Sequence, residues 1–325
     1  MKKRIKLRFV DKGTDFVPEN DYYYKVLARH YDIEISNNPE YIICSVNGFS
    51  HMKYTNCIKI VDIGENICPD FNEFDYAVGF DHLSFGDRYL RVPLYVFFKE
   101  YKKLAQREQV MLSDDKKLLD RKFCCFVVSN GNISNPLRRI FFEKLSKYKR
   151  VDSGGRWMNN IGGPVKNKDE FIREYKFNIA FENSSSPGYT TEKVMQPLAE
   201  NVVPIYWGNP LIDLDFQTES MVLIKNEDDI ERAIEEIIYL DTHDDAYLKK
   251  LRTPCLVKDF NYYDRQLEDF LRHIVDQPLV KAKRLNTFGF QPIYRQRMRR
   301  MYKIEEKLKT PYKLLKKIQS LFTNV

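Results

Sequence analysis

The residues best suited to chemistry lie in one stretch, Lys176–Gly208, which reads KFNIAFENSSSPGYTTEKVMQPLAENVVPIYWG. Its apolar ends and polar middle predict a strand, a loop, a helix and a second strand. The loop Glu182–Tyr189 leads into a helix that opens near Thr191. A hydroxyl at the cap leaves the first backbone N–H groups of the helix pointing outward, and Lys193 adds a full positive charge beside them. Together these groups could hold a diphosphate without a metal ion.

The same pattern also has a purely structural interpretation. Helix caps of this kind are common in proteins that bind no ligand there. Lys193 could be a solvated residue of the first turn, and Glu192 an acid that complements the helix dipole. The local pattern alone therefore leaves both interpretations open.

The first third of the chain predicts the start of an α/β domain. The stretch Asp21–Tyr31 has apolar residues at the spacing of one helix face, and it lies between the first two apolar runs. Strand, helix and strand in this order form an α/β unit. Five short apolar segments are predicted strands: Ile5–Val10, Tyr41–Val46, Cys57–Ile63, Tyr76–Gly79 and Leu90–Tyr95.

A second α/β series follows a charged stretch, Val96–Lys122, that contains no strand-like run. This stretch marks the domain junction and divides the chain into domains 1–112 and 113–280. Alternating strands and helices favour parallel sheets covered by helices on both faces. The predicted strands are Phe123–Val128, Phe177–Phe181, Val202–Tyr206 and Met221–Ile224, with a further strand near Val151. The predicted helices are Leu137–Tyr148, Lys168–Tyr175, Thr191–Glu200, Asp228–Leu240 and Ala246–Leu251.

Several motifs resemble glycosyltransferase family 10, the α1,3/4-fucosyltransferases. The run FENSSSPGYTTEK followed by VVPIYWG is similar to the signature of that family. Further similar pieces occur in the order of the family, namely GEN at 64–66, YAVGFD at 76–81, VVSN at 127–130 and VDSGG at 151–155. The resemblance covers roughly residues 57–262.

This resemblance implies a GT-B architecture, in which two Rossmann-like domains face a central cleft. The first domain would bind the acceptor and the second GDP-fucose. Carried over motif by motif, Lys193 contacts the donor phosphates and Glu192 the fucose region, where it takes part in catalysis. The remaining donor-binding positions are Arg138, Asn183 and Tyr189, with Arg138 preferred over Arg139 because the downstream FFEKLSK anchors the alignment.

Inversion at the anomeric carbon needs a base that takes the proton of the acceptor. The acceptor domain must supply it, and Glu65 fits because it follows a predicted strand at the carboxyl end, where ligands of α/β sheets bind. Glu65 could instead be a surface acid of a turn. Three nearby acids compete for the role: Asp62, Glu73 and Asp81. Neither His51 nor His82 is assigned a catalytic role, since a single histidine is more often structural.

The sequence predicts no metal site and no structural disulfides. It has no clear Asp-x-Asp pattern that would hold a metal–diphosphate complex, so no cofactor is expected, although stimulation by Mn²⁺ or Mg²⁺ stays open. Its six cysteines form no CxxC pair and are interpreted as free thiols of a reducing cytosol. The N-terminus shows neither a signal peptide nor a transmembrane stretch. These features predict a cytoplasmic enzyme.

The charge of the chain is concentrated in a basic tail, 281–325. The tail holds 13 Lys or Arg and two Glu, which leaves the preceding body at −4 within a formal total of +7. An acidic body without a nucleic-acid motif argues against nucleic-acid binding. The tail is amphipathic, and Pro311 predicts two short helices. We expect it to pack partly on the body and to contact the cytoplasmic face of the inner membrane.

The resemblance to family 10 thus implies an inverting α1,3-fucosyltransferase of bacterial type. It would transfer L-fucose from GDP-fucose to the GlcNAc of an N-acetyllactosamine-type acceptor, an oligosaccharide or lipid-linked glycan of lipopolysaccharide or capsule synthesis. Two alternatives stay open, a related glycosyltransferase with another nucleotide-hexose donor and a non-catalytic sugar-nucleotide-binding protein.

Overall fold

The computed structural model describes residues 2–105, 107, 115–129, 131 and 135–322, with backbone alone from 309 onward. Within this range the chain forms two compact α/β units. Unit 1 comprises Met1–Gly79, Leu83–Leu90 and Gln266–Val325, and unit 2 comprises Phe80–His82 and Arg91–Arg265.

The unit boundaries differ from the predicted domain boundaries. The predicted junction between 112 and 113 lies outside the described residues, and the main segment of unit 2 begins earlier, at Arg91. The chain returns to unit 1 at Gln266, whereas the sequence placed the end of the second domain at 280. The return lies inside a helix, where no change in composition marks it.

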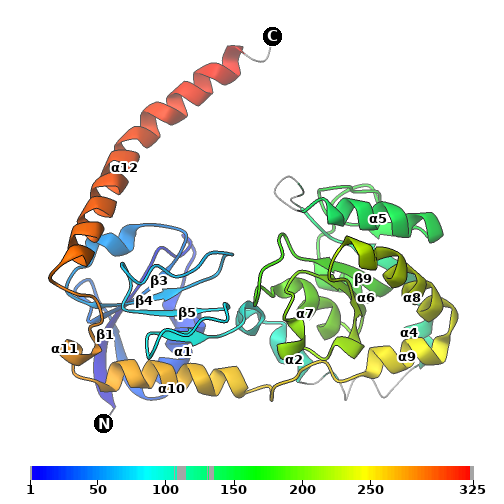
Figure 1. The fold of residues 1–325 in the computed structure, drawn as a ribbon, viewed down its shortest axis with the longest axis horizontal. Coiled ribbons are helices and arrows are strands. Elements are labelled where there is room, and N and C mark those ends of the chain that lie inside the picture. The colour runs from blue at the N-terminus through cyan, green and yellow to red at the C-terminus, as the bar shows by residue number, and fades with distance from the viewer. Residues whose placement is uncertain (1, 106, 108–114, 130, 132–134, 323–325) are drawn as a thin grey trace. The chain divides into compact units, whose positions relative to one another are not determined.

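Unit 1 is built on a six-stranded sheet in the order β2-β1-β3-β4-β5-β6, in which β1 to β5 run parallel. Figure 1 shows these strands in blue and cyan. The strands are β1 (Lys3–Val10), β2 (Tyr31–Ile35), β3 (Tyr41–Ser45), β4 (Ile58–Asp62), β5 (Tyr76–Gly79) and β6 (Tyr89–Arg91). The described α-helices are α1 (Tyr22–Ala28), α11 (Leu279–Ala282) and α12 (Phe290–Phe322), and α10 (Tyr262–Asp276) continues from unit 2 into unit 1.

Unit 2 repeats this plan with five parallel strands in the order β11-β10-β9-β7-β8. The strands are β7 (Lys122–Phe126), β8 (Val151–Ser153), β9 (Tyr175–Phe181), β10 (Val203–Trp207) and β11 (Val222–Leu223). The described α-helices are α2 (Tyr101–Leu104), α4 (Asp115–Leu119), α5 (Leu137–Tyr148), α6 (Lys168–Arg173), α7 (Glu192–Ala199), α8 (Ile230–Thr242) and α9 (Asp244–Arg252).

Helices cover both faces of the sheet in unit 2. On one face α5 lies beside α8, and α8 beside α9, and their apolar residues join the strands in one large core cluster. On the other face α7 packs against α2 and α6 (Figure 1). Because both faces are covered, every residue of β9 is buried. The prediction of parallel sheets between helix layers is confirmed.

The strand order places a switch point in each sheet. Counted along the chain, both sheets contain the order 2-1-3-4-5, in which the connections leave the first strand in opposite directions. In doubly wound sheets ligands bind outside the carboxyl ends of the strands at this reversal. The switch point lies between β1 and β3 in unit 1 and between β7 and β9 in unit 2.

Several predicted helices, such as those over Asp21–Tyr31 and Lys168–Tyr175, end a few residues earlier in the structure, and two predictions differ more. The strand predicted over Leu90–Tyr95 ends at Arg91, because Pro93 has no N–H to donate to a ladder. The two helices predicted in the tail are one, since α12 continues through Pro311. Proline removes one hydrogen bond and favours a kink, but it does not have to end a helix whose other bonds remain.

Candidate active site

Strand β9 and helix α7 bring the signature residues together at the switch point of unit 2. The strand ends at Phe181, so Glu182 and Asn183 come at its carboxyl edge. Thr191 is the cap of α7, and its hydroxyl accepts a bond from the backbone N–H of Lys193 at 3.5 Å. The first turn of α7 therefore begins at the edge of the sheet, as the sequence predicts.

Glu182 is the buried anchor of this site. Its carboxylate accepts hydrogen bonds from the Thr191 backbone N–H at 2.8 Å and from the Thr191 hydroxyl at 2.9 and 2.8 Å. Gly208 makes the close packing feasible, because a Cβ there would lie 2.4 Å from Cγ of Glu182. Burial raises the pKa of Glu182, and the neighbouring Lys193 opposes this shift. The glutamate fixes the start of α7 to the end of β9.

Lys193 lies between two carboxylates. Its Nζ atom is 3.1 Å from Oε2 of Glu182 and 3.4 Å from Oε1 of Glu192, and it donates to the Thr191 hydroxyl at 3.0 Å. Burial alone lowers the pKa of Lys193, but the two carboxylates outweigh it, so the pKa lies above its usual value. The ammonium group is thus charged and held beside the N-terminus of α7.

Glu192 is ionised in the same cluster. Burial tends to raise its pKa, but the positive charges of Lys193 and Lys168 outweigh burial and lower it. About a quarter of its side chain stays exposed, at 27%. A carboxylate with this exposure can contact a ligand that also contacts Lys193.

Arg138 lies on the first turn of α5 and is fully buried. Its Nη2 donates to the Phe181 carbonyl at 2.5 Å and to Oδ1 of Asn183 at 2.9 Å. Its Nε and Nη1 have no hydrogen-bond partner among the described residues. Burial lowers the pKa of Arg138, and Glu182 and Glu192 oppose the shift. Unused guanidinium donors of this kind suit an anionic ligand.

Tyr189 is buried in the loop before α7. Its ring centroid lies 5.2 Å from that of Phe80, and its hydroxyl is close enough to influence the pKa of Lys193 and Arg138. The neighbouring Gly188 has a φ of +85°, and a Cβ there would lie 2.3 Å from the Phe80 carbonyl oxygen. Four of the five predicted donor-binding residues thus lie between the end of β9 and the first turn of α7, and the fifth, Arg138, reaches the end of β9 from α5.

Unit 1 has an open depression of about 710 Å³ at its own switch point. Its walls come from the loops that follow β1, β3 and β4, and include Asp11, Asn47 and Gly64. Glu65 directly follows Gly64 in the turn after β4 and is exposed. The predicted base thus lies next to the position where a doubly wound sheet binds ligands.

The competing acids have other surroundings. Asp62 lines the same depression and pairs there with Lys12 at 3.0 Å. Glu73 is only 3% exposed, and Asp81 belongs to the short segment assigned to unit 2. Among these acids Asp62 lines the depression and Glu65 lies one residue beyond its edge, so the structure does not distinguish the two, and Glu65 stays the base predicted from the sequence.

The sequence matches two family models. Residues 7–98 match the α-(1,3)-fucosyltransferase FucT N-terminal domain, and residues 116–252 match the C-terminal domain of glycosyltransferase family 10 (fucosyltransferase). A crystal structure of an α1,3-fucosyltransferase is 30% identical, with a TM-score of 0.73 over 85% of this chain and 91% of that one. The chain belongs to glycosyltransferase family 10. The predicted family and the predicted GT-B fold are thereby confirmed.

Two further proteins are similar to this chain in sequence or in structure. The α-(1,3)-fucosyltransferase FucT of Helicobacter pylori is 34% identical over 72% of this chain, which spans 56% of the length of that relative. A crystal structure of an α1,3-fucosyltransferase with GDP-fucose is 29% identical, with a TM-score of 0.72, and the match covers 85% of this chain and 92% of that one.

Two residues of this family 10 site had no role assigned from the sequence. Glu182 was part of the quoted motif, and a carboxylate at the end of an apolar strand is a signal that could have identified it. Lys168, at the start of α6, acts on the pKa of Glu192. No local pattern connects it to α7, because the fold alone brings α6 and α7 together. Asn130 of the VVSN motif lies outside the described residues.

The remaining predictions concern metals, thiols and histidines. Among the described residues, no group of three or more His, Cys, Asp or Glu could hold a metal ion. All six cysteines are free. His51 is buried with its Nδ1 atom 3.3 Å from the Asp11 carboxylate, which is a structural position. No described helix is long and apolar enough to cross a membrane.

Proposed function

We propose that this chain is an inverting α1,3-fucosyltransferase that uses GDP-fucose as donor. The acceptor in this proposal is the GlcNAc of an N-acetyllactosamine-type glycan. The observation that carries the proposal is the cluster of Lys193, Glu192 and Arg138 at the switch point of unit 2, in a fold that resembles a crystal structure with GDP-fucose.

The cluster in unit 2 supports binding of the donor diphosphate. Lys193 contributes an ammonium group, and the first N–H groups of α7 contribute the positive end of the helix dipole. Arg138 contributes guanidinium donors that have no partner among the described residues. These groups stabilise the charge that grows on the diphosphate as GDP leaves.

The transfer step needs one proton acceptor and one leaving group. The acceptor hydroxyl oxygen attacks C1 of fucose from the face opposite GDP, while the bond between C1 and the diphosphate oxygen breaks. Glu65 takes the hydroxyl proton, and GDP leaves with the bonding electrons. The ionised Glu192 stabilises positive charge that develops on the fucose ring. The products are the fucosylated glycan and GDP.

The proposal includes no obligatory metal ion. Lys193, Arg138 and the N-terminus of α7 supply the positive charge that a metal would otherwise bring to the diphosphate. The prediction is that turnover continues in EDTA. A loss of turnover in EDTA that Mn²⁺ restores would contradict this part of the proposal alone.

Release of GDP from GDP-fucose, measured in EDTA with and without N-acetyllactosamine, tests the mechanism. We expect acceptor-dependent turnover by the wild type. Glu65→Ala should lower kcat by about 10²–10⁴-fold, the usual contribution of a general base. Lys193→Ala should lower kcat/KM by about 10²–10³-fold, because it removes a charge that stabilises the leaving group.

The outcomes separate the parts of the proposal. Binding of GDP-fucose without turnover would support the donor site and contradict the proposed acceptor, so that other acceptors would be tested. Turnover with another nucleotide sugar in a donor panel, and none with GDP-fucose, would replace the donor. No binding of GDP-fucose at all would overturn the proposal.

We also propose that α12 contacts the cytoplasmic face of a membrane, where lipid-linked glycans serve as acceptors. Met301, Ile304 and Leu308 are 62, 58 and 57% exposed and share one face of the helix because they are three and four residues apart. Basic residues of the same helix lie beside this apolar face. An exposed apolar face with basic neighbours is typical of helices that lie on anionic membranes.

A further inference from the structure

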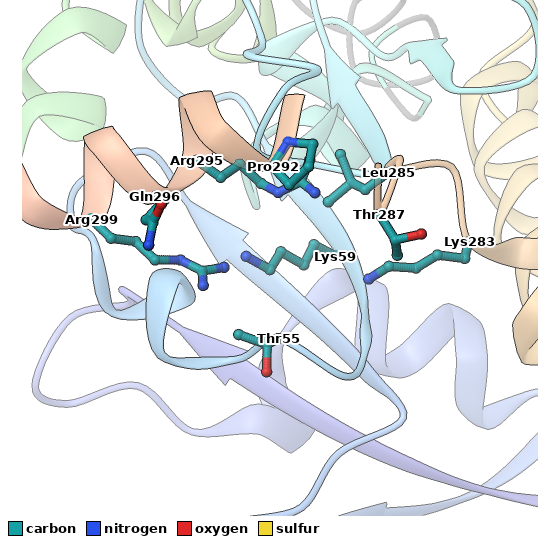
Figure 2. Close-up of a pocket in the computed structure, with 9 residues that line it drawn as sticks. All are labelled: Thr55, Lys59, Lys283, Leu285, Thr287, Pro292, Arg295, Gln296 and Arg299. Carbon is teal, nitrogen blue, oxygen red and sulfur yellow. The ribbon is translucent and has the colours of Figure 1, made fainter. Parts of the chain in front are cut away.

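A second cavity of unit 1, of about 230 Å³, lies between strand β4 and the segment that contains the start of α12. Figure 2 shows its lining. Four cationic side chains contribute to it, namely Lys59, Lys283, Arg295 and Arg299. None of the site residues described above lines this cavity, and all of its lining residues belong to unit 1.

Lys59 is the unusual member of this set. It lies on β4 and is only 1% exposed, and its Nζ atom has no hydrogen-bond partner among the described residues. In Figure 2 its side chain extends toward Arg299, with Lys283 on its other side. Burial lowers the pKa of Lys59, with the charge of Glu73 opposing the shift. A lysine buried without a hydrogen-bond partner is unfavourable, so its presence needs an explanation.

The other three basic side chains differ in how many of their donors have hydrogen-bond partners. Nε of Arg299 is buried and, like Nζ of Lys59, has no hydrogen-bond partner among the described residues. Arg295 donates to two backbone carbonyls of neighbouring loops. Lys283 donates to the Cys57 carbonyl at 2.7 Å. Two of the four cations therefore retain a buried donor that a ligand could use.

Two carboxylates lie near the cavity, and neither makes a direct hydrogen bond to the Lys59 side chain. Glu73 is buried, but neither of its oxygens has a hydrogen-bond partner among the described residues, so it makes no direct bond to Lys59. Burial raises the pKa of Glu73, against the opposing charge of Lys59. Asp75 lies 3.6 Å from Lys283 and accepts from three backbone N–H groups. Neither acid lines the cavity, whereas four basic side chains do.

We propose that this cavity binds a phosphate group. Lysine and arginine are the usual partners of phosphate oxygens, and the unused donors of Lys59 and Arg299 face the same space. The volume suffices for such a group, since one water occupies about 30 Å³ of liquid. The phosphate has two natural sources, a free phosphate or diphosphate and a phospholipid headgroup.

The test measures the apparent Tm of the full chain with sodium pyrophosphate and with sodium chloride at equal ionic strength. We expect pyrophosphate at about ten times its Kd to raise the Tm of the wild type by roughly 3 °C. Lys59→Met and Arg299→Gln should lose the part of this rise that the cavity contributes. Arg300→Gln is the matched control, because it removes an exposed charge from the same helix and should keep the rise.

A second arm covers the lipid source with vesicles of phosphatidylcholine containing phosphatidic acid. If the headgroup is the ligand, Lys59→Met should weaken sedimentation with these vesicles at least tenfold, and Lys6→Gln, which removes an exposed charge from strand β1, much less. Equal responses of the wild type and Lys59→Met in both arms, or no response in either, would overturn the proposal. Because Lys193 could also attract pyrophosphate, only the difference between wild type and Lys59→Met is scored, and GDP-fucose turnover remains a separate measurement.

Discussion

Opposite charges at the start of α7 hold one another in place. Lys193 is in ionic contact with Glu182 and Glu192, yet the two acids differ in burial, at 0 and 27% side-chain exposure. Their pKa values move in opposite directions, with Glu182 raised and Glu192 lowered. Glu182 thus serves as the structural partner of Lys193, and Glu192 is the carboxylate that can face a ligand.

The lowered pKa of Glu192 gives a prediction about pH. An acid whose pKa is lower in the folded state stabilises the fold above its unfolded pKa, about 4.3, and this contribution is lost as pH falls through the folded pKa. The Tm of the wild type should therefore exceed that of Glu192→Gln at pH 7, and the difference should shrink by about pH 3.5. Thermal unfolding at both pH values measures it. Glu170→Gln, an exposed acid of α6, is the control, and a difference that grew on acidification would contradict the prediction.

At the scale of elements, the loop before α7 depends on one glycine. Gly188 combines a positive φ with a close approach to the Phe80 carbonyl, so a side chain would meet both strain and a clash. Gly188→Ala should lower stability by about 1–3 kcal/mol or displace the loop, and raise the KM for GDP-fucose. Gly162→Ala is a matched control, because Gly162 has a φ of +89° but nothing within 4 Å of an added Cβ. Urea unfolding and GDP-release kinetics of both variants decide whether the contact matters beyond the strain.

The bounds of an element were predicted best where its pattern of apolar residues is regular from end to end. Helix α5 and strand β5 have the predicted bounds, because α5 follows a period of 3.6 and β5 is a continuous buried run. Strand β2 was missed, since it lies at the sheet edge and is partly exposed. Lys168 and the cavity at Lys59 could not be predicted, because only the fold brings their partners together.

At the scale of the whole molecule, the same strand order occurs twice and gives each unit one switch point. The cationic cluster with Lys193 lies at the switch point of unit 2, and the open depression next to Glu65 lies at the switch point of unit 1. The family 10 motifs predicted the residues at both positions from the sequence. The tail has no such motif, and its role depends on which of its faces remain exposed.

Helix α12 provides the prediction that concerns the molecule and its surroundings. The apolar residues Met301, Ile304 and Leu308 form one stripe, and the exposed Arg300, Lys303 and Lys307 form another, offset by one residue. One residue corresponds to about 100° around the helix, so the stripes adjoin. An anionic membrane could then contact both, with about 1 kcal/mol for each basic residue near the surface.

Two triple variants separate the contributions of the stripes. Replacing Met301, Ile304 and Leu308 by Ser should weaken sedimentation with phosphatidylglycerol vesicles at every salt concentration. Replacing Arg300, Lys303 and Lys307 by Gln should weaken it mainly at low salt, because ions screen charges beyond about 10 Å at 0.1 M. GDP-fucose turnover on a soluble acceptor should change little in either variant. Binding by the wild type that neither variant weakened would exclude residues 300–308 of this helix as the membrane contact, since both stripes would then be dispensable.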